Sequence, residues 1–236
     1  MEDRSIIFDG KNSLTDFGVV VQSASIGLPS KTKNRVQIPN TNIYYDYAAL
    51  FGDVYAERTL EYVFLISNVN AMSTAELEHK KFEIANWLMP GTQHELWDSV
   101  IFNYHFVGEV QSSPEYTDND DYGTFKVDFV CYPFRIRDGA EGDDIWDTFD
   151  FETDVAQDTS FSVDSTTNVL LINVGVEPVS PEIIVTGSVT VTIGSTSKTL
   201  SAGTYTDTDL ILAVGENTVT LSGSGTIKFV WYKEVI

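Results

Sequence analysis

The stretch Gly123-Thr-Phe-Lys-Val-Asp-Phe-Val-Cys131 alternates apolar and polar side chains with a period of two. One phase holds Phe125, Val127, Phe129 and Cys131, and the other holds Lys126 and Asp128. Successive side chains of a strand point to opposite faces, so this pattern predicts a strand with one buried face. Cys131 is then expected to be a buried, inert thiol, and as the single cysteine it allows no intrachain disulfide.

Around this strand the first part of the chain reads as α+β, with strands dominant. Ser73-Thr-Ala-Glu76 fits a capping box and Pro90-Gly91 fits a stop, which predicts one helix of about residues 73–89. Its apolar stripe contains Leu77, Ile84 and Leu88. Further strands are predicted at Ser5–Phe8, Phe17–Ser23, Leu60–Ile66, Val100–Val110 and Gly123–Ile136.

The second part of the chain shows no helical period. Short apolar alternations recur at 145–151, 159–164, 168–174, 182–186, 189–193, 209–214, 217–221 and 226–232. Turns rich in Gly, Ser, Asn and Asp separate them, which is typical of an antiparallel β-sandwich or jelly roll. The fold class predicted for the whole chain is therefore mainly β.

A shift in composition separates the two parts. Residues 1–137 carry 19 acidic and 11 basic side chains, whereas residues 138–236 carry 16 and 3. Arg137-Asp-Gly-Ala-Glu-Gly-Asp-Asp144 has the Gly-rich, acidic character of an exposed connection. We predict an N-terminal domain at 1–137, an acidic linker at 138–144 and a C-terminal domain at 145–236, with 138–144 a poorly protected hinge in the acidic segment 138–158.

The net charge of −21 argues against two classes of partner. Binding to nucleic acid and to anionic membranes relies on Lys and Arg, so neither is expected. No apolar run approaches the roughly 20 residues of a membrane span, and the N-terminus lacks the features of a signal peptide. We expect a soluble protein that is made without Sec export and folds without disulfides.

Residues that could carry chemistry are present but do not form a recognisable motif. His94-Glu-Leu-Trp-Asp98 lacks the second His of a zinc helix, and His79 and His105 are read as surface and packing residues. Asp118–Gly123 begins like a calcium loop but lacks its Glu, so an acidic hairpin tip is expected. No catalytic residue, metal site or cofactor is predicted, although a pair of carboxylates among 35 would suffice for a glycosidase.

Three aromatic residues of the second domain could form a platform on which a sugar stacks. These candidates are Tyr205, Trp146 and Trp231. In a small sandwich, large aromatic side chains more often pack in the core or at an edge. Carbohydrate binding therefore remains the alternative function, and an enzyme is the third.

The order of several motifs resembles that of the distal tail proteins of phages, the Dit family of siphophage tail tips. In the first domain the motifs are Phe8–Val21, Gln37-Ile-Pro-Asn40, Ile43-Tyr-Tyr-Asp-Tyr47, Ala85-Asn-Trp-Leu88 and Cys131-Tyr-Pro-Phe134. In the second they are Leu171–Gly175, Pro181–Val185, Ile211–Asn217 and Gly223–Ile227. Pro39-Asn-Thr-Asn42 departs from the Pro-Gly-Arg-Asp-Gly that is usual in the family, so that turn must differ.

The resemblance implies a structural virion protein rather than an enzyme. It implies a homohexameric ring formed by the N-terminal domains, which joins the tail tube protein to the tail-associated tip protein. The C-terminal domains, galectin- or carbohydrate-module-like, would project outward and in some relatives hold receptor-binding or baseplate proteins. The implied location is the phage tail tip, after assembly in the host cytoplasm.

Overall fold

The computed structural model describes residues 3–33, 35–46, 48, 52–67, 73–89, 91–119, 122–143 and 146–236. The chain forms two compact units, which we call unit 1 (residues 1–135 with Ile236) and unit 2 (residues 136–235). Both consist mainly of antiparallel strands, so the predicted mainly β fold class is confirmed.

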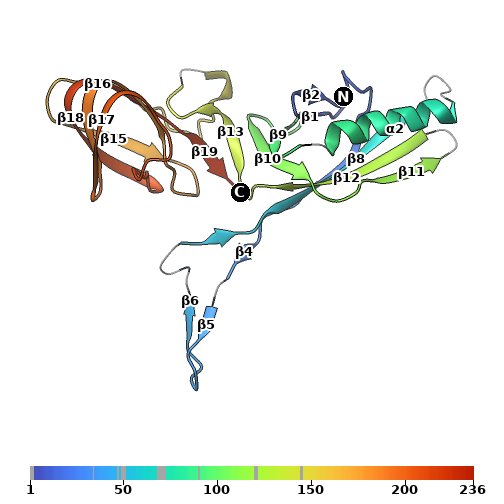
Figure 1. The fold of residues 1–236 in the computed structure, drawn as a ribbon, viewed down its shortest axis with the longest axis horizontal. Coiled ribbons are helices and arrows are strands. Elements are labelled where there is room, and N and C mark those ends of the chain that lie inside the picture. Colours follow the sequence, from blue (N-terminus) through green and yellow to red (C-terminus); the bar gives the residue numbers. More distant parts are fainter. Residues whose placement is uncertain are drawn as a thin grey trace. The chain divides into compact units, whose positions relative to one another are not determined.

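Unit 1 is built on a large antiparallel sheet with the strand order β2-β1-β9-β10-β12-β8-β3, and β11 pairs with β12 (Figure 1). The strands are β1 (Ile6–Phe8), β2 (Lys11–Asn12), β3 (Val20–Ile26), β8 (Arg58–Ser67), β9 (His94–Asp98), β10 (Tyr104–Val110), β11 (Glu115–Asn119) and β12 (Tyr122–Cys131). The long pair β8–β12 lies in register from Arg58 opposite Cys131 to Ser67 opposite Tyr122.

The alternation in β12 has the predicted consequence. Phe125, Val127 and Phe129 lie opposite Phe64, Tyr62 and Leu60 and are at most 2% exposed. Cys131 ends this buried face with no exposed area, and burial raises the pKa of its thiol to about 12. The prediction of a buried thiol is therefore confirmed. A thiol with that pKa also stays protonated at neutral pH.

Helix α2 (Thr74–Leu88) is held by the predicted capping box. Ser73 Oγ accepts from the Glu76 amide, and the Glu76 carboxylate accepts from the Ser73 amide at 2.7 Å. The helix packs on the sheet through Leu77, Ile84, Trp87 and Leu88. Trp87 also donates its indole N–H to the Phe8 carbonyl at 2.8 Å, so the helix belongs to the core of unit 1. The predicted stop at Pro90 lies outside the described residues.

Two predicted strands of unit 1 are shorter than expected because turns interrupt them. Residues 99–103 form a turn in which the Asp98 carboxylate accepts from the Val100 amide and Asn103 takes a φ of 63°. The strand predicted at Val100–Val110 therefore begins only at Tyr104. In the same way Pro133 separates β12 from β13 (Arg135–Ala140) within the range predicted as one strand.

Between β3 and β8, the chain forms a long hairpin that we call the arm, residues 28–56 (Figure 1). It contains two small sheets, each of two strands. The outer one pairs β5 (Arg35–Gln37) with β6 (Tyr44–Asp46), and the inner one pairs β4 (Lys31–Thr32) with β7 (Val54–Tyr55). No described residue of the arm belongs to the buried core of either unit.

Unit 2 has a five-stranded antiparallel sheet in the order β14-β18-β16-β17, with β15 also paired to β18. The strands are β14 (Ser160–Val163), β15 (Thr167–Asn173), β16 (Glu182–Ile193), β17 (Thr196–Tyr205) and β18 (Gly215–Val230). β13 pairs with β19 (Tyr232–Val235) outside this five-stranded sheet. The core of the unit contains Leu171, Val189, Leu221, Phe229 and Trp231, all at most 2% exposed.

Glycines join strands that the sequence presents as separate. β16 covers two of the predicted strands and β18 covers another two. Gly187 sits at a register shift in β16 and takes a φ of 81°. A Cβ atom on Gly225 would lie 1.8 Å from the Thr186 carbonyl oxygen, so glycine permits the two long strands to approach there.

The segments predicted as a linker and as the first strand of the second domain have different structures. Residues 138–140 belong to β13 rather than to an exposed connection, and Glu141 is only 2% exposed. The burial of Glu141 is tolerated because cationic side chains lie next to this acidic segment. The range 145–151 contains the 3₁₀ helix η1 (Trp146–Thr148) and a turn at Asp150, whose side chain accepts from the Glu152 amide at 2.9 Å. Ile145 lies outside the described residues.

Candidate interaction surfaces

The histidines are dispersed over unit 1. His79 is exposed on α2 near Glu83, His94 on β9 lies 3.4 Å from Asp9, and His105 on β10 is buried beside the Trp97 ring. Within the described ranges, no three His, Cys, Asp or Glu residues gather as metal ligands would. The acidic tip at Asp118–Gly123 joins β11 to β12, and its residues 120 and 121 lie outside the described part of the chain.

A buried polar cluster in unit 1 has a structural role. The Asp98 carboxylate accepts hydrogen bonds from Tyr62 Oη at 2.9 Å and from Arg4 Nε at 3.0 Å. Burial and the Asp98 charge raise the pKa of Tyr62, so the phenol remains a donor. The cluster ties the start of the chain to β8 and β9.

The structure does not bring the three sugar-platform candidates together on one exposed face. Trp231 is 2% exposed within the core of unit 2, and Tyr205 packs partly against the same core while its hydroxyl donates to the Ser201 carbonyl. Trp146 in η1 is 64% exposed. One exposed ring of the three is available to a ligand.

The arm forms the first candidate surface because it exposes large apolar side chains. These are Leu28, Val36, Ile43, Tyr44, Tyr45 and Val54, between 52% and 76% exposed. Val36 and Tyr45 lie directly opposite each other on one face of the outer sheet. A hairpin of two strands cannot cover its own apolar faces, so such residues indicate a surface that another chain covers.

The charges of the arm are nearly balanced. Residues 28–56 contain three basic and two acidic side chains, in contrast to the net −21 of the whole chain. Asp53 pairs with Lys31 and Lys33, and Asp46 pairs with Arg35 and with Lys33. The arm is therefore the part of this acidic chain that a second acidic copy would repel least.

The second candidate surface is a group of aromatic rings in unit 2, which we call the aromatic rim: Trp146, Phe149 and Phe151. Trp146 and Phe151 are 64% and 79% exposed. The centroids of the Trp146 and Phe149 rings are 5.4 Å apart, and those of Phe149 and Phe151 are 5.1 Å apart. These rings contact one another while leaving broad faces open to solvent.

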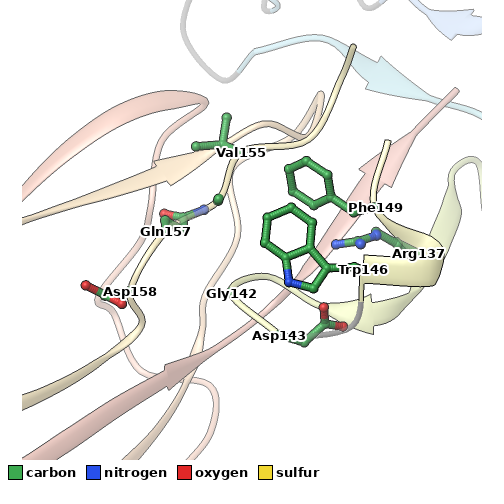
Figure 2. A pocket seen from close by; sticks show the side chains of 9 residues that line it. Arg137, Gly142, Asp143, Trp146, Phe149, Val155, Gln157 and Asp158 are labelled. Carbon is green, nitrogen blue, oxygen red and sulfur yellow. The ribbon is translucent and has the colours of Figure 1, made fainter. Parts of the chain in front are cut away.

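A cavity of about 260 Å³ lies beside the aromatic rim. Figure 2 shows Trp146 and Phe149 on one side of it, Val155 and Gln157 on the other, and Arg137 beside the indole. Asp143 and Asp158 add carboxylates to its lining. The cavity and the rim form one continuous feature of unit 2.

Arg137, which lines the cavity, belongs to a buried ionic cluster that we call the ionic floor: Arg137, Glu141, Asp154 and Lys233. Asp154 lies 3.4 Å from Arg137 Nη2 and 2.8 Å from Lys233 Nζ. Glu141 lies 3.9 Å from Arg137 Nη1, and burial raises the pKa of its carboxyl. The two cations and two acidic groups make a rigid and nearly neutral base.

The residues of both surfaces can be found in the sequence, but the sequence does not show that their side chains are exposed. Trp146, Phe149 and Phe151 follow a spacing that suits an edge or core strand. The signal against that interpretation was the placement of Asp147, Asp150 and Glu152 among them, because carboxylates rarely enter a core unpaired. The arm carried no comparable signal, since its strands are only two or three residues long.

These features define a mainly β protein of two units with an extended arm and no recognisable catalytic centre among the described residues. The same fold occurs in a solved structure entitled "Crystal Structure of SPP1 Dit (gp 19.1) Protein, a Paradigm of Hub Adsorption Apparatus in Gram-positive Infecting Phages". The TM-score is 0.69 over 100% of both chains, at 13% sequence identity. No family model and no curated protein matches the sequence. No helix in the described ranges is long and apolar enough to cross a membrane.

Proposed function

We propose that this protein is a structural component of a phage tail tip, and that six copies form a ring through unit 1. The observation that carries the proposal is the fold similarity to SPP1 Dit, because it extends over the whole of both chains. In this role the ring connects the tail tube protein to the tail-associated tip protein, and unit 2 anchors adhesion components such as a receptor-binding protein.

The arm supports assembly through unit 1. Its exposed apolar side chains need a partner, and its balanced charge suits contact with another copy of this acidic chain. Unit 1 carries 19 acidic and 10 basic side chains in residues 1–135, a net of −9, whereas residues 136–235 carry 16 and 4, a net of −12. Close packing of six copies is therefore less costly through unit 1.

The acidic balance also suits a ring that DNA passes through. A surface rich in carboxylates repels phosphate, so DNA would move through the lumen without binding to it. An acidic lumen therefore suits a conduit for DNA.

Electron microscopy of the purified full-length chain in negative stain tests the proposal. We expect ring-shaped particles with sixfold symmetry and an open centre, in numbers that increase with protein concentration. Particles with no rotational symmetry at every concentration, including in the presence of the tail tube protein, would contradict it.

A further inference from the structure

The aromatic rim and the cavity belong to unit 2, so a hexamer that forms through unit 1 gives them no role. Trp146 and Phe149 line the cavity, and Phe151 extends the exposed aromatic surface beyond it. Exposed aromatic clusters of this kind mark sites of interaction, because each ring offers a large contact area at a small cost in side-chain entropy.

The carboxylates around the rim determine which ligand fits. Residues 138–158 contain nine Asp and Glu and no Lys or Arg. Two of the nine, Glu141 and Asp154, belong to the ionic floor, where Arg137 and Lys233 balance them. Among the other carboxylates of this segment, Asp143 and Asp158 line the cavity itself, together with Arg137 of the ionic floor.

Aromatic faces together with carboxylates are the features that bind a cationic side chain. The face of an indole attracts an ammonium or guanidinium group, and a carboxylate can pair with the same group. The cavity of about 260 Å³ is smaller than the pockets of about 300–1,000 Å³ that hold drug-sized ligands. It has room for one long side chain.

The floor of the cavity is held in place by hydrogen bonds. Gln157 donates to the Ile172 carbonyl at 2.8 Å and accepts from the Ile172 amide at 2.8 Å. The same side chain also donates to the Glu141 carboxylate at 3.2 Å. Lys233 donates to the Thr153 carbonyl at 3.1 Å and to the Asp154 carboxylate at 2.8 Å. A ligand would therefore meet a preformed site, which reduces the entropy cost of binding.

We propose that the cavity beside Trp146 is a docking site for a Lys- or Arg-bearing segment of a partner protein. Charge complementarity with the acidic rim selects this occupant over a neutral sugar, which would stack on Trp146 but leave the carboxylates unused. A second copy of this chain fits less well, because the basic residues of its arm, Lys31, Lys33 and Arg35, already pair with Asp46 and Asp53. The proposal deepens the proposed function, on which it rests only for the identity of the partner as a tail-tip component.

Titration of the full-length protein with short synthetic peptides tests the site. One peptide contains two Lys and two Arg residues, and its matched control replaces them with acetyl-lysine and citrulline. Isothermal titration calorimetry measures binding, so the readout does not depend on Trp146, the most exposed of the four tryptophans, which the key variant removes. At about 150 mM salt we expect the basic peptide to bind saturably with a Kd below about 1 mM. The control peptide should not bind.

Variants separate docking in the cavity from general attraction to an acidic protein. Trp146→Ala keeps every charge and should weaken peptide binding about tenfold, because the cation–π contact is lost. Asp158→Asn should weaken binding, whereas Asp207→Asn, a carboxylate of unit 2 outside the cavity, should leave it unchanged. Thermal melts of each variant show that the fold persists.

Three results would overturn the proposal. Equal affinities of wild type and Trp146→Ala would show attraction by charge alone. Saturable binding of host cell-wall polysaccharide that Trp146→Ala abolishes would assign the cavity to a sugar. Loss of self-association in Trp146→Ala would assign it to a second copy. The peptide assay does not require a ring, so its failure and the failure of ring assembly are distinguishable.

Discussion

The arm of unit 1 and the aromatic rim of unit 2 both expose large apolar side chains, but their charges differ. In the arm, ion pairs across the hairpin neutralise nearly every charge. Residues 138–158, which contain the rim, carry nine Asp and Glu and no Lys or Arg. Both surfaces expose apolar area, and the difference in charge underlies the partner that we propose for each: another copy of the chain for the arm, and a basic protein for the rim.

The largest expected effect comes from removing the apolar face of the arm. The double variant Val36→Ser, Tyr45→Ser should abolish self-association of the full chain, because these facing residues supply much of the exposed apolar area. The melting temperature of the monomer should not change, since neither residue belongs to a core. Light scattering and thermal melts measure the two effects.

Val214→Ser provides the control for the arm variant. Val214 is 51% exposed, close to the 53% of Val36, but lies in unit 2. It should leave self-association unchanged. Equal losses in both variants would show that general surface hydrophobicity, rather than the arm, causes association.

Truncation of the two tryptophans of unit 2 should change the free energy of unfolding by very different amounts. Trp231→Ala removes a ring that is 2% exposed, and we expect a loss of about 3–5 kcal/mol in the free energy of unfolding. Trp146→Ala, at 64% exposure, should change that free energy by less than about 0.5 kcal/mol. Urea unfolding measures both values. A comparable loss for Trp146→Ala would mean that the rim is part of the core rather than a docking surface.

Truncation of the helix cap should have a smaller effect, confined to unit 1. Ser73→Ala removes the acceptor for the Glu76 amide and should cost about 1 kcal/mol. Thr74→Ala, at the next position, is the matched control and should be nearly neutral. Urea unfolding of both variants checks the difference, and equal stabilities would contradict a role for the cap.

The ionic floor should make stability depend on pH in a predictable direction. Burial raises the pKa of Glu141, so the folded state holds its proton more strongly than the unfolded state does. Wild type should therefore lose stability as pH rises from about 4.3 through the raised folded pKa, whereas Glu141→Gln should not. The advantage of the variant should appear at pH 7.5 and vanish at pH 4.

Unfolding in urea at these two pH values measures the effect of Glu141→Gln. Glu216→Gln, which removes an exposed carboxyl of the same unit, is the matched control variant. A wild type that gains stability relative to Glu141→Gln as pH rises would contradict the raised pKa.

Local patterns in the sequence predicted the elements that local forces determine. The phase of Phe125, Val127 and Phe129 predicted the buried face of β12, and Ser73 with Glu76 predicted the start of α2. These predictions held because a strand period or a capping box depends on neighbours within a few residues.

Features that depend on distant partners could not be predicted in the same way. The acidic run at 138–144 looked like a solvated linker, yet Glu141 is buried because Arg137 and Lys233 lie close by. Lys233 lies 92 positions farther along the chain than Glu141. The prediction of a strand at 145–151 was wrong, because the Asp150 side chain accepts a hydrogen bond from the Glu152 amide and so stabilises a turn. Trp146 was identified as a candidate, but its exposure and its cavity appear only in the folded chain.

The central claim is that unit 1 assembles this chain into a ring of six. Native mass spectrometry of the full-length protein, over a range of concentrations, tests it most directly. We expect a species of six times the 26.2 kDa chain mass, which the Val36→Ser, Tyr45→Ser variant lacks. A 26.2 kDa species alone at every concentration, with and without the tail tube protein, would contradict it.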